Sequence, residues 1–532
     1  MPSSYIYPGI YIEEILSGVR TITGVSTSDT VFVGFFKRGP MNEPVRITSF
    51  ADFERLFGGL DTRSKASYAI QQYYLNGGQI AWVVRVADGA QTAVLDLDGG
   101  SPADTVLTLK AASPGLWGKN VEIVVGHIDS DRNLFNLVVR EVATVRSRER
   151  VVNSEIHRNL SMSTTSSRYV KDVLKEQSLL VRATSVGTGD LPSQTDPTVG
   201  DVTSAIVVGN VDSTAFKSLG DDPVDSANAV SDGKPPEDSM TWINGMKTLN
   251  TIEPDIFNIL CLPAVADLGD TAMAAVYSEA TTYCEDKRAF LIVDIPESIV
   301  TVTQMTRWMK NTGESLRHHN AAVYFPRIEI SDRLNEDRPL NVASGGTLAG
   351  IFARTDATRG VWKAPAGTEA ALRGATIKTR LTDPESGTLS QMGINVLRSF
   401  PIYGNICWGG RTLNGADQQA SEWKYIPIRR TALYIEESLY QGLKWVVFEP
   451  NDEPLWAQIR LNVGGFMHNL FRQGAFPGST PREAYFVKCD KETTTQNDIG
   501  RGIVNILVGF AAHRPAEFVV IKIQQIAGQI ET

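Results

Sequence analysis

Cysteine and histidine are scarce in this chain, which has four cysteines and six histidines in 532 residues. Structural zinc sites usually combine closely spaced Cys or His pairs, and the sequence has no CxxC pair. We therefore expect no metal and interpret the cysteines as buried free thiols in a reducing compartment. His318 and His319 are adjacent, and on a helix their rings point about 100° apart, so we expect surface histidines at a helix end.

Long apolar runs are also missing. No run approaches the roughly 20 residues that a membrane helix needs. The first eleven residues have neither the basic nor the apolar region of a secretory signal. We expect no direct membrane insertion and a protein that is made and folded in a cytoplasm.

Positive charge is in deficit, with 51 Lys and Arg against 60 Asp and Glu and a formal net charge of −9. A general nucleic-acid binder needs a basic face that displaces counterions from phosphate. We therefore expect no direct contact with nucleic acid.

Catalytic motifs are missing as well. The sequence has no HExxH and no GxSxG, and the Gly-Lys of 115–120 lacks the other residues of a phosphate-binding loop. Asp294, at a strand end, and Asp332, just after a strand, have no partner nucleophile or base in the sequence pattern, so capping and turn roles are favoured. We expect no catalytic residue and no cofactor.

Strand and helix patterns alternate in 21–90 and again in 240–342, which predicts an α/β core with a mostly parallel sheet. Ser49 and Asp52 fit a capping box, and Gly58 and Gly59 stop the helix that follows it. The predicted strands are 30–36, 80–86, 255–262, 289–295 and 321–330. The other predicted helices are 63–75, 271–287 and 302–318.

The composition changes between these two segments. Only four aromatic residues occur from 91 to 235, and 187–238 has ten acidic residues against two lysines. Short alternating runs in this region indicate strands, and the Ser, Thr, Gly and Pro content indicates loops. We therefore predict an inserted, β-rich outer domain at 91–239.

The remainder, 343–514, is predicted to form a C-terminal domain. Its helices are expected at 429–442 and 453–472, and its strands at 484–489 and 503–513. The fold class is thus mixed α/β, with an inserted β-rich domain and two extended arms at 1–20 and 515–532.

Both arms have the residues of β-strands. Their strand-forming side chains are Tyr5, Ile6, Tyr7, Ile10, Tyr11 and Ile12, and Phe518, Val520, Ile521, Ile523 and Ile526. A terminal strand needs a ladder partner for its backbone N–H and C=O groups. The pattern leaves open whether each arm pairs within its own subunit or adds to a sheet of a neighbouring subunit.

Many short runs of the chain resemble the contractile tail sheath family, and they occur in the same order. Together they make the resemblance specific, although each run alone is weak. The runs are PGIYIEE (8–14), GVSTS (24–28), 39–59, YLNGG (74–78), AWVVRV (81–86), SPGLWGKN (113–120), GINV (393–396), WGGRT (408–412), 425–430 and FEPND (448–452).

The resemblance implies a structural subunit that stacks as rings around an inner tube. In this family the arms reach neighbouring subunits and complete a shared sheet, and a variable domain is inserted on the outside. The implied partners are further copies of the chain, the inner tube protein, and baseplate and terminator or cap proteins. The implied location is a phage tail or a tail-like injection particle, in which contraction drives the tube through a target envelope.

A helix of the C-terminal domain touches the tube in this family, and the best match here is 453–472. Trp456, with Ile459, Val463 and Leu470, forms an apolar stripe at helical spacing. Trp456, Arg460 and Arg472 are the candidate contact residues of this helix, and the two arginines are expected to face an acidic tube. The alternative is that these arginines are solvated or paired with Glu436, Glu437 or Glu449.

Two other functions remain as alternatives to a contractile sheath. One is a non-contractile structural ring protein. The other is a soluble α/β enzyme with an unrecognised site, which the absence of catalytic motifs disfavours.

Overall fold

The computed structural model describes residues 20–99, 105–128, 131–145, 147–187, 190–199, 201–211, 213–220, 230–253, 256–518 and 520. The chain forms two compact units. The body consists of Thr27–Thr358 and Pro365–Lys424. The C-terminal unit consists of Met1–Ser26, Arg359–Ala364 and Tyr425–Thr532.

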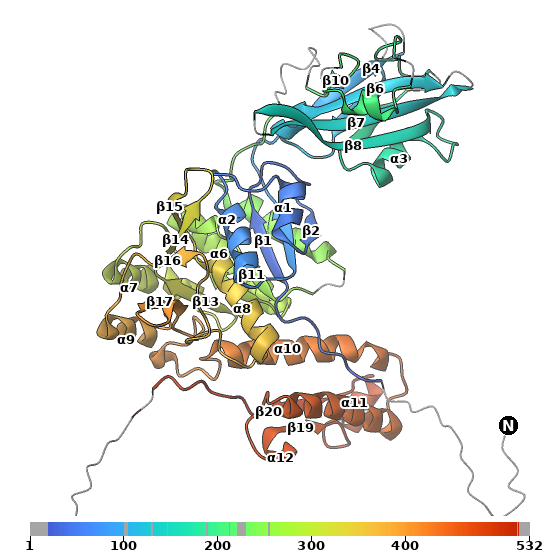
Figure 1. Cartoon of the computed structure of the whole chain (residues 1–532). Coiled ribbons are helices and arrows are strands. Elements are labelled where there is room, and N and C mark those ends of the chain that lie inside the picture. The colour runs from blue at the N-terminus through green and yellow to red at the C-terminus, as the bar shows by residue number, and fades with distance from the viewer. Residues whose placement is uncertain are drawn as a thin grey trace, which may run out of the picture. The chain divides into compact units, whose positions relative to one another are not determined.

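An eight-stranded sheet lies at the centre of the body (Figure 1). Its six inner strands are parallel, and each edge strand is antiparallel to its neighbour. The inner strands are rich in β-branched residues, as expected for strands that are buried on both faces. The order is β18 (Gly404–Cys407), β17 (Asn395–Phe400), β13 (Ala321–Phe325), β12 (Phe290–Val293), β11 (Ile259–Cys261), β1 (Thr30–Gly34), β3 (Ala81–Arg85) and β2 (Pro44–Ile47).

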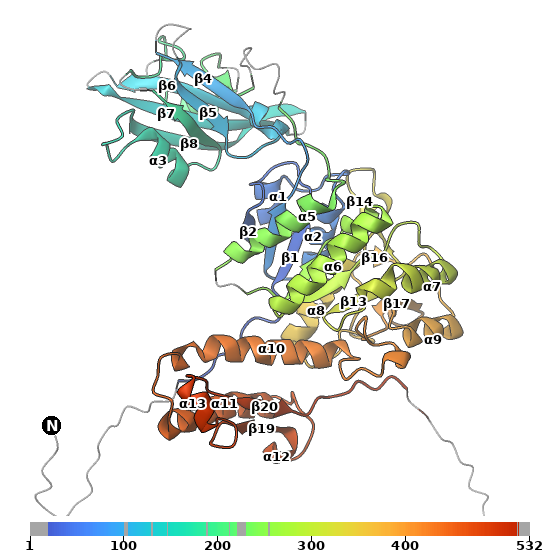
Figure 2. The same ribbon diagram turned by 180° about the vertical axis from the view of Figure 1, so that it is seen from behind.

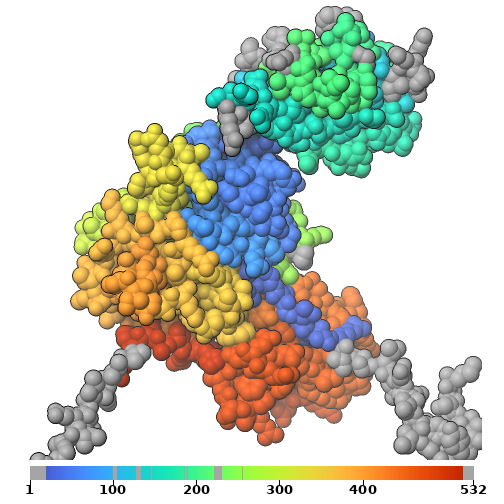
Figure 3. Space-filling model, in the orientation of Figure 1, coloured from blue at the N-terminus to red at the C-terminus, as the bar shows by residue number. Residues whose placement is uncertain are grey.

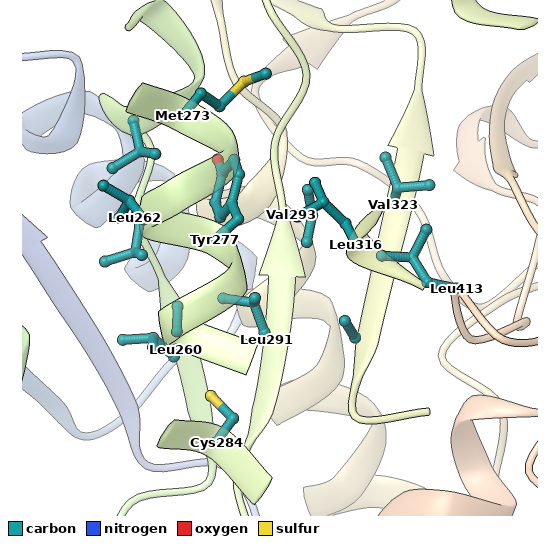
Figure 4. Close-up of a cluster of buried hydrophobic side chains, with 14 of the residues drawn as sticks. Leu260, Leu262, Met273, Tyr277, Cys284, Leu291, Val293, Leu316, Val323 and Leu413 are labelled. Carbon is teal, nitrogen blue, oxygen red and sulfur yellow. The ribbon is translucent and has the colours of Figure 1, made fainter. Parts of the chain in front are cut away.

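Helices cover both faces of this sheet (Figures 1 and 2). On one face the core consists of strand residues such as Leu260, Leu291 and Val323 under helix residues such as Tyr277 and Cys284 (Figure 4). The helices that contribute to this core are α5 (Ser239–Lys247), α6 (Asp270–Asp286), α7 (Val302–Asn311) and α9 (Asp383–Gln391). The other face carries α1 (Phe50–Phe57), α2 (Lys65–Asn76) and α8 (Gly345–Arg359).

Helix α8 packs on α2 backbone to backbone. A Cβ added at Gly346 lies 2.2 Å from the carbonyl oxygen of Ala69, and one at Gly350 lies 2.5 Å from that of Tyr73. Glycine is therefore required at both positions, because any side chain separates the two helices.

The local signals predicted from the sequence are present at the start of the body. The hydroxyl of Ser49 accepts from the amide of Asp52 (3.1 Å), and Gly58 ends α1 at φ +86°. Helix α2 ends at Asn76 with Gly77 in the left-handed region, as the Asn-Gly-Gly run predicts.

Two predicted elements differ from the structure. The strand predicted over 321–330 is two strands, β13 and β14 (Ile328–Asp332), which lie in different sheets with Pro326 between them. Proline has no amide N–H to donate to a ladder, so it favours a break there. The helix predicted over 302–318 ends at Asn311, and a 3₁₀ turn at Gly313–Leu316 follows it.

The segment predicted as a β-rich insert folds into two antiparallel sheets that share one core. One sheet has the order β4 (Val94–Asp98), β5 (Thr105–Ala111), β9 (Val181–Val186). The other has the order β10 (Lys217–Ser218), β6 (Val121–Ile128), β7 (Asp131–Val145), β8 (Arg148–Ser161). Two short helices, α3 (Val170–Gln177) and α4 (Ala205–Gly209), pack on these sheets.

The predicted limit of the C-terminal domain, between 342 and 343, does not coincide with the limit between the compact units. Strands β17 and β18 extend the central sheet, and β14 pairs with β15 (Arg338–Val342) and β16 (Ala375–Thr376). Residues up to Lys424, apart from Arg359–Ala364, therefore belong to the body. The cause is the long-range pairing of β13 with β17, which residue patterns do not reveal.

The C-terminal unit is smaller. It contains α10 (Ile426–Gly442), α11 (Glu453–Arg472), α12 (Pro481–Ala484), β19 (Tyr485–Lys488), α13 (Gln496–Gly500) and β20 (Leu507–Phe510). Its core lies between α11, α10 and the strand pair β19–β20. In the described part of the chain, none of the helices combines the length and the hydropathy of a membrane-spanning segment.

Candidate assembly site

The strand pair β19–β20 is the centre of the candidate site. Tyr485, Val487, Val508 and Phe510 point inward and pack on the core under α11. The opposite face is exposed at Phe486, where the ring lies against Gly509: a Cβ added there lies 2.3 Å from the ring. One face of this two-stranded sheet is thus packed on the core, and the other face is exposed to solvent.

Both outer edges of this small sheet lack a ladder partner among the described residues. An isolated two-stranded sheet is only marginally stable in water, and additional strands are normally needed. Each free edge presents backbone N–H and C=O groups to which another strand can pair. The site is therefore suited to strand addition.

The two chain ends contain strand-forming sequence. Tyr5, Ile6, Tyr7, Ile10, Tyr11, Ile12, Ile521, Ile523 and Ile526 lie outside the described residues. Phe518 and Val520 are described; they are 83% and 78% exposed and form no strand. The Tyr425 hydroxyl lies 3.1 Å from a carboxylate oxygen of Glu517, to which it donates, so the chain is held to the unit shortly before these exposed residues.

Helix α11 has the bounds predicted from the sequence. Asp452 caps its start by accepting from the amide of Leu455 (3.2 Å). The predicted apolar stripe is buried, including Trp456, Ile459, Val463 and Leu470. Trp456 also donates its ring N–H to Asn451 (2.9 Å). Because its side chain lies in the core, Trp456 is not available for the tube contact that we predicted for it.

The two predicted arginines have different environments. Arg460 is half-buried, forms an ion pair with Glu453 (2.6 Å) and donates to the carbonyl of Cys489, at the end of β19. It therefore joins α11 to β19. Arg472 is exposed at the end of α11 and forms no ion pair within the described ranges. None of the three acidic partners considered from the sequence is bonded to either arginine, and Glu436 pairs with Arg429 instead.

The outer face of α11 has a feature that our sequence reasoning missed. Gly464 and Gly465 lie in the middle of this 20-residue helix, and a Cβ added at either meets no atom within 4 Å. Each glycine in a helix interior costs about 0.5–1 kcal/mol relative to alanine. The fold of the chain does not require them. The sequence did contain a signal for this feature, because a pair of glycines is unusual inside a strong helical pattern.

Possible chemical sites in the body have structural roles. Asp294 is buried, and its carboxylate accepts from the amide of Gly345 (2.8 Å) at the start of α8. Burial raises the pKa of Asp294 to about 7. Asp332 accepts from the Tyr68 hydroxyl (2.7 Å) and from the amide of Leu334. These contacts hold helices and a turn, as expected for capping and turn roles.

The histidine pair differs from the prediction. His318 and His319 lie in a turn, not on a helix, and their rings stack with centroids 4.2 Å apart. Their ligand atoms and one of Glu285 lie within 4.8 Å of one another. However, Nδ1 of His318 accepts from the amide of Asn320, and Nε2 lies 3.2 Å from Glu285. Both ring nitrogens of His318 thus have hydrogen-bond partners within the chain.

The sequence of the C-terminal unit matches a known family. The model of the phage tail sheath C-terminal domain matches residues 418–526, which include α10, α11 and the strand pair. This part of the chain is therefore similar to the C-terminal domain of phage tail sheath proteins.

Further similarity extends beyond this domain. A prophage major tail sheath protein of Pseudomonas aeruginosa is 26% identical over 255 residues, which is 47% of this chain and 61% of the relative. The chain thus matches about three fifths of that relative's length.

Solved structures with a similar fold include two contracted sheaths. The helical sheath of the anti-feeding prophage in its contracted state has a TM-score of 0.57 and 22% identity, covering 98% of this chain and all of that one. The sheath complex of the extracellular contractile injection system PVC, also contracted, has a TM-score of 0.57 and 20% identity, covering 98% of both chains. At these identities the structures show the shared fold. By sequence and by fold, the chain is similar to contractile tail sheath proteins.

Proposed function

We propose that this chain is the sheath subunit of a contractile phage tail or tail-like injection particle. The observation that carries the proposal is the incomplete sheet β19–β20, inside a sheath C-terminal domain and in a chain whose two ends are rich in strand-forming residues. The arms of neighbouring copies complete this sheet by strand addition. The subunits thereby form stacked rings and a continuous helical polymer.

Strand exchange explains how such a polymer changes length without dissociating. Each backbone hydrogen bond contributes only about 0.5–1.5 kcal/mol net, but a full strand with packed side chains holds two subunits together. The arms act as tethers while the bodies rotate. The extended sheath is the less stable state, and contraction releases free energy through larger interfaces between subunits.

The outer face of α11 is the surface proposed for the inner tube. Gly464 and Gly465 permit a close approach of another backbone, and Arg472 supplies an exposed positive charge near the end of the helix. Exposed charge pairs contribute about 0–1 kcal/mol, which suits a contact that must be released on contraction. Baseplate and cap proteins are the partners proposed for the ends of the polymer.

The proposed role is structural and not enzymatic. The buried acids of the body are engaged in helix and turn contacts, and the sheath relatives are themselves structural proteins. We propose that the subunit folds in a cytoplasm before it enters the particle.

Removal of 515–532 tests the proposal. The shortened chain is expected to remain a folded monomer, because β19 and β20 stay paired, and to lose polymerisation. Circular dichroism and sedimentation report folding, and negative-stain microscopy reports tubes or stacked rings. Tubes formed by the shortened chain contradict strand exchange through this arm. Rings of the intact chain that exist in only one length favour a non-contractile ring protein.

A further inference from the structure

Three sequence runs that resemble the sheath family, but that the assembly site does not use, meet where the insert joins the rest of the body. They are 39–59, AWVVRV (81–86) and SPGLWGKN (113–120), and all lie in one compact unit. The third run lies in the insert, between β5 and β6. The first two lie in the N-terminal part of the body, which is blue in Figure 3 and adjoins the insert, in cyan and green.

Arg85, at the end of β3, connects the three runs. Its Nη1 donates to the carbonyl oxygens of Gly39 (2.9 Å) and Pro114 (2.6 Å). Its Nη2 donates to the carbonyl oxygen of Asp232 (3.2 Å), in the segment that returns from the insert. The side chain of Arg85 is fully buried, and a buried charge is costly unless its donors are bonded. Movement of the insert away from β3 therefore leaves this charge without its partners.

The carboxylate of Asp232 makes a second connection. One oxygen accepts from the amide of Leu116 (2.7 Å), in the insert, and the other accepts from Nη2 of Arg63 (2.8 Å), just before α2. The amide of Gly39 also donates to the hydroxyl of Ser113 (3.0 Å). Asp232 and Ser113 are buried, so opening these contacts leaves polar groups unsatisfied.

Two further contacts lie at the edge of this network. Nη1 of Arg38 donates to Glu141 of β7 (2.9 Å), and its guanidinium lies 4.3 Å from the centre of the Trp117 ring. Gly115 has φ +138°, and a Cβ added there meets the carbonyl oxygen of Lys37. Glycine is therefore needed at this position, because any side chain separates the backbone of the insert from that of the N-terminal segment.

The two linkers of the insert provide only a narrow connection. They pair with each other through backbone bridges, Asp88 with Lys234 and Gln91 with Ser231. A two-stranded ribbon is marginally stable by itself, and motion between domains is expected unless an interface prevents it. The contacts of the 113–117 loop therefore decide whether the insert swings on its linkers.

We propose that the network of Arg38, Arg63, Arg85 and Asp232 with these partners, the insert junction, holds the insert and the rest of the body as one rigid piece. The insert keeps its orientation and turns with the body. This inference concerns the free subunit and does not rest on the proposed function. If the proposed function also holds, the insert follows the rotation of the body on contraction. The two fail separately, because one is measured within a chain and the other by polymerisation.

The distance between a label on the insert and a label beside the central sheet tests the junction. Lys175 on α3 and Lys310 on α7 are exposed, and the four natural cysteines are buried, so labels react at Lys175→Cys and Lys310→Cys. The full chain carries two spin labels and is diluted in unlabelled protein, so double electron–electron resonance measures distances within one chain. One narrow distance distribution is expected. A broad distribution or two distances in this otherwise natural chain overturn the proposal.

Substitutions in the junction test its cause. Arg85→Met keeps an apolar stem of similar length and removes the three hydrogen bonds, so it is expected to lose the narrow distance while circular dichroism remains that of a folded chain. Arg38→Met combined with Asp232→Ala opens the same junction without changing β3, and it replaces Arg85→Met if that variant does not fold. A folded junction variant that keeps the narrow distance overturns the proposal.

Hydrogen exchange at the amides of Gly39 and Leu116 reports the opening of the junction directly. Arg38→Met removes a charge-assisted hydrogen bond and is expected to speed this exchange about tenfold. Arg55→Ala loses the exposed ion pair with Asp52 on α1 (3.2 Å) and is the matched control, expected to change neither exchange nor distance. If the Arg38→Met and Arg55→Ala variants exchange these amides at the same rate, the contacts of Arg38 do not hold the junction and the proposal is overturned.

Discussion

Two sheets of this chain, the central sheet of the body and the β19–β20 pair, differ in how complete they are. The central sheet of the body has eight strands and helices on both faces, and inner strands such as β1, β12 and β13 are buried along their whole length. The β19–β20 pair of the C-terminal unit has one covered face and, among described residues, two open edges. The first sheet stabilises its own unit, whereas the second leaves hydrogen-bonding capacity for other strands. Under the proposed function, one sheet thus stabilises the subunit and the other serves assembly.

The largest expected effect is on the free energy of unfolding. It is tested by replacing one aromatic residue in each of these two sheets. Phe32 of β1 is fully buried and contacts the Tyr73 ring, so Phe32→Ala is expected to destabilise the body by about 3–5 kcal/mol. Phe486→Ala on the open face of β19 is expected to change the stability of the free subunit by less than about 0.5 kcal/mol. Urea unfolding measures both. If Phe486→Ala destabilises the free subunit as much as Phe32→Ala, the small sheet is not an open surface.

A buried charge in the body provides the second prediction. Asp294 has a pKa of about 7 in the folded chain against an ordinary 3.8, because burial disfavours its ionised form. Between about pH 4 and 7 the unfolded chain gives up this proton and the folded chain keeps it, so stability falls as pH rises. Asp294→Asn removes this loss and is expected to stabilise the body by about 2 kcal/mol at pH 8, but little at pH 4.

Unfolding of both proteins at the two pH values checks this prediction. Asp196→Asn is the control, because the carboxylate of Asp196 is not buried and hydrogen bonds with Thr198 lower its pKa. If Asp294→Asn changes the stability equally at pH 4 and pH 8, the raised pKa of Asp294 is contradicted.

The two arginines of α11 provide a third, smaller effect within the C-terminal unit. Arg460→Glu loses the ion pair with Glu453 and the bond to the Cys489 carbonyl, and is expected to destabilise the unit by about 1–2 kcal/mol. Arg472→Glu is expected to leave the stability unchanged and to weaken only attachment to the tube. Thermal unfolding and co-sedimentation with assembled tubes distinguish these outcomes. Full attachment of the Arg472→Glu variant removes this residue from the tube surface.

Local signals explain how much of this fold the sequence could predict. Ser49, Gly58 and Gly77 act on neighbouring residues, so α1 and α2 were predicted with nearly correct limits. Helix α11 has its predicted limits for the same reason, with an apolar stripe as the signal. The pairing of β13 with β17 joins residues about 70 positions apart and has no local signal, so the extent of the body was missed.

Prediction of the candidate site from the sequence is limited in the same way. The strand-forming character of the arms and the helix α11 were readable from residue types and spacing. The apolar stripe indicated the buried side of α11, but Trp456 was also taken as a contact residue because of its type, and tertiary packing buries it. The role of Arg460 depends on β19, which follows it by 25 positions, so it too could be found only in the folded chain.

The smallest expected effect comes from replacing glycine with alanine in a helix of each unit. Gly464→Ala and Gly465→Ala on α11 meet open space, so each is expected to stabilise the free subunit by about 0.5–1 kcal/mol. Gly350→Ala on α8 is the matched control and is expected to destabilise the body, because the new methyl group meets the Tyr73 carbonyl. If α11 receives another backbone, the stabilised variants bind assembled tubes more weakly. Variants that are more stable and bind tubes normally show instead that the glycine pair does not serve this contact.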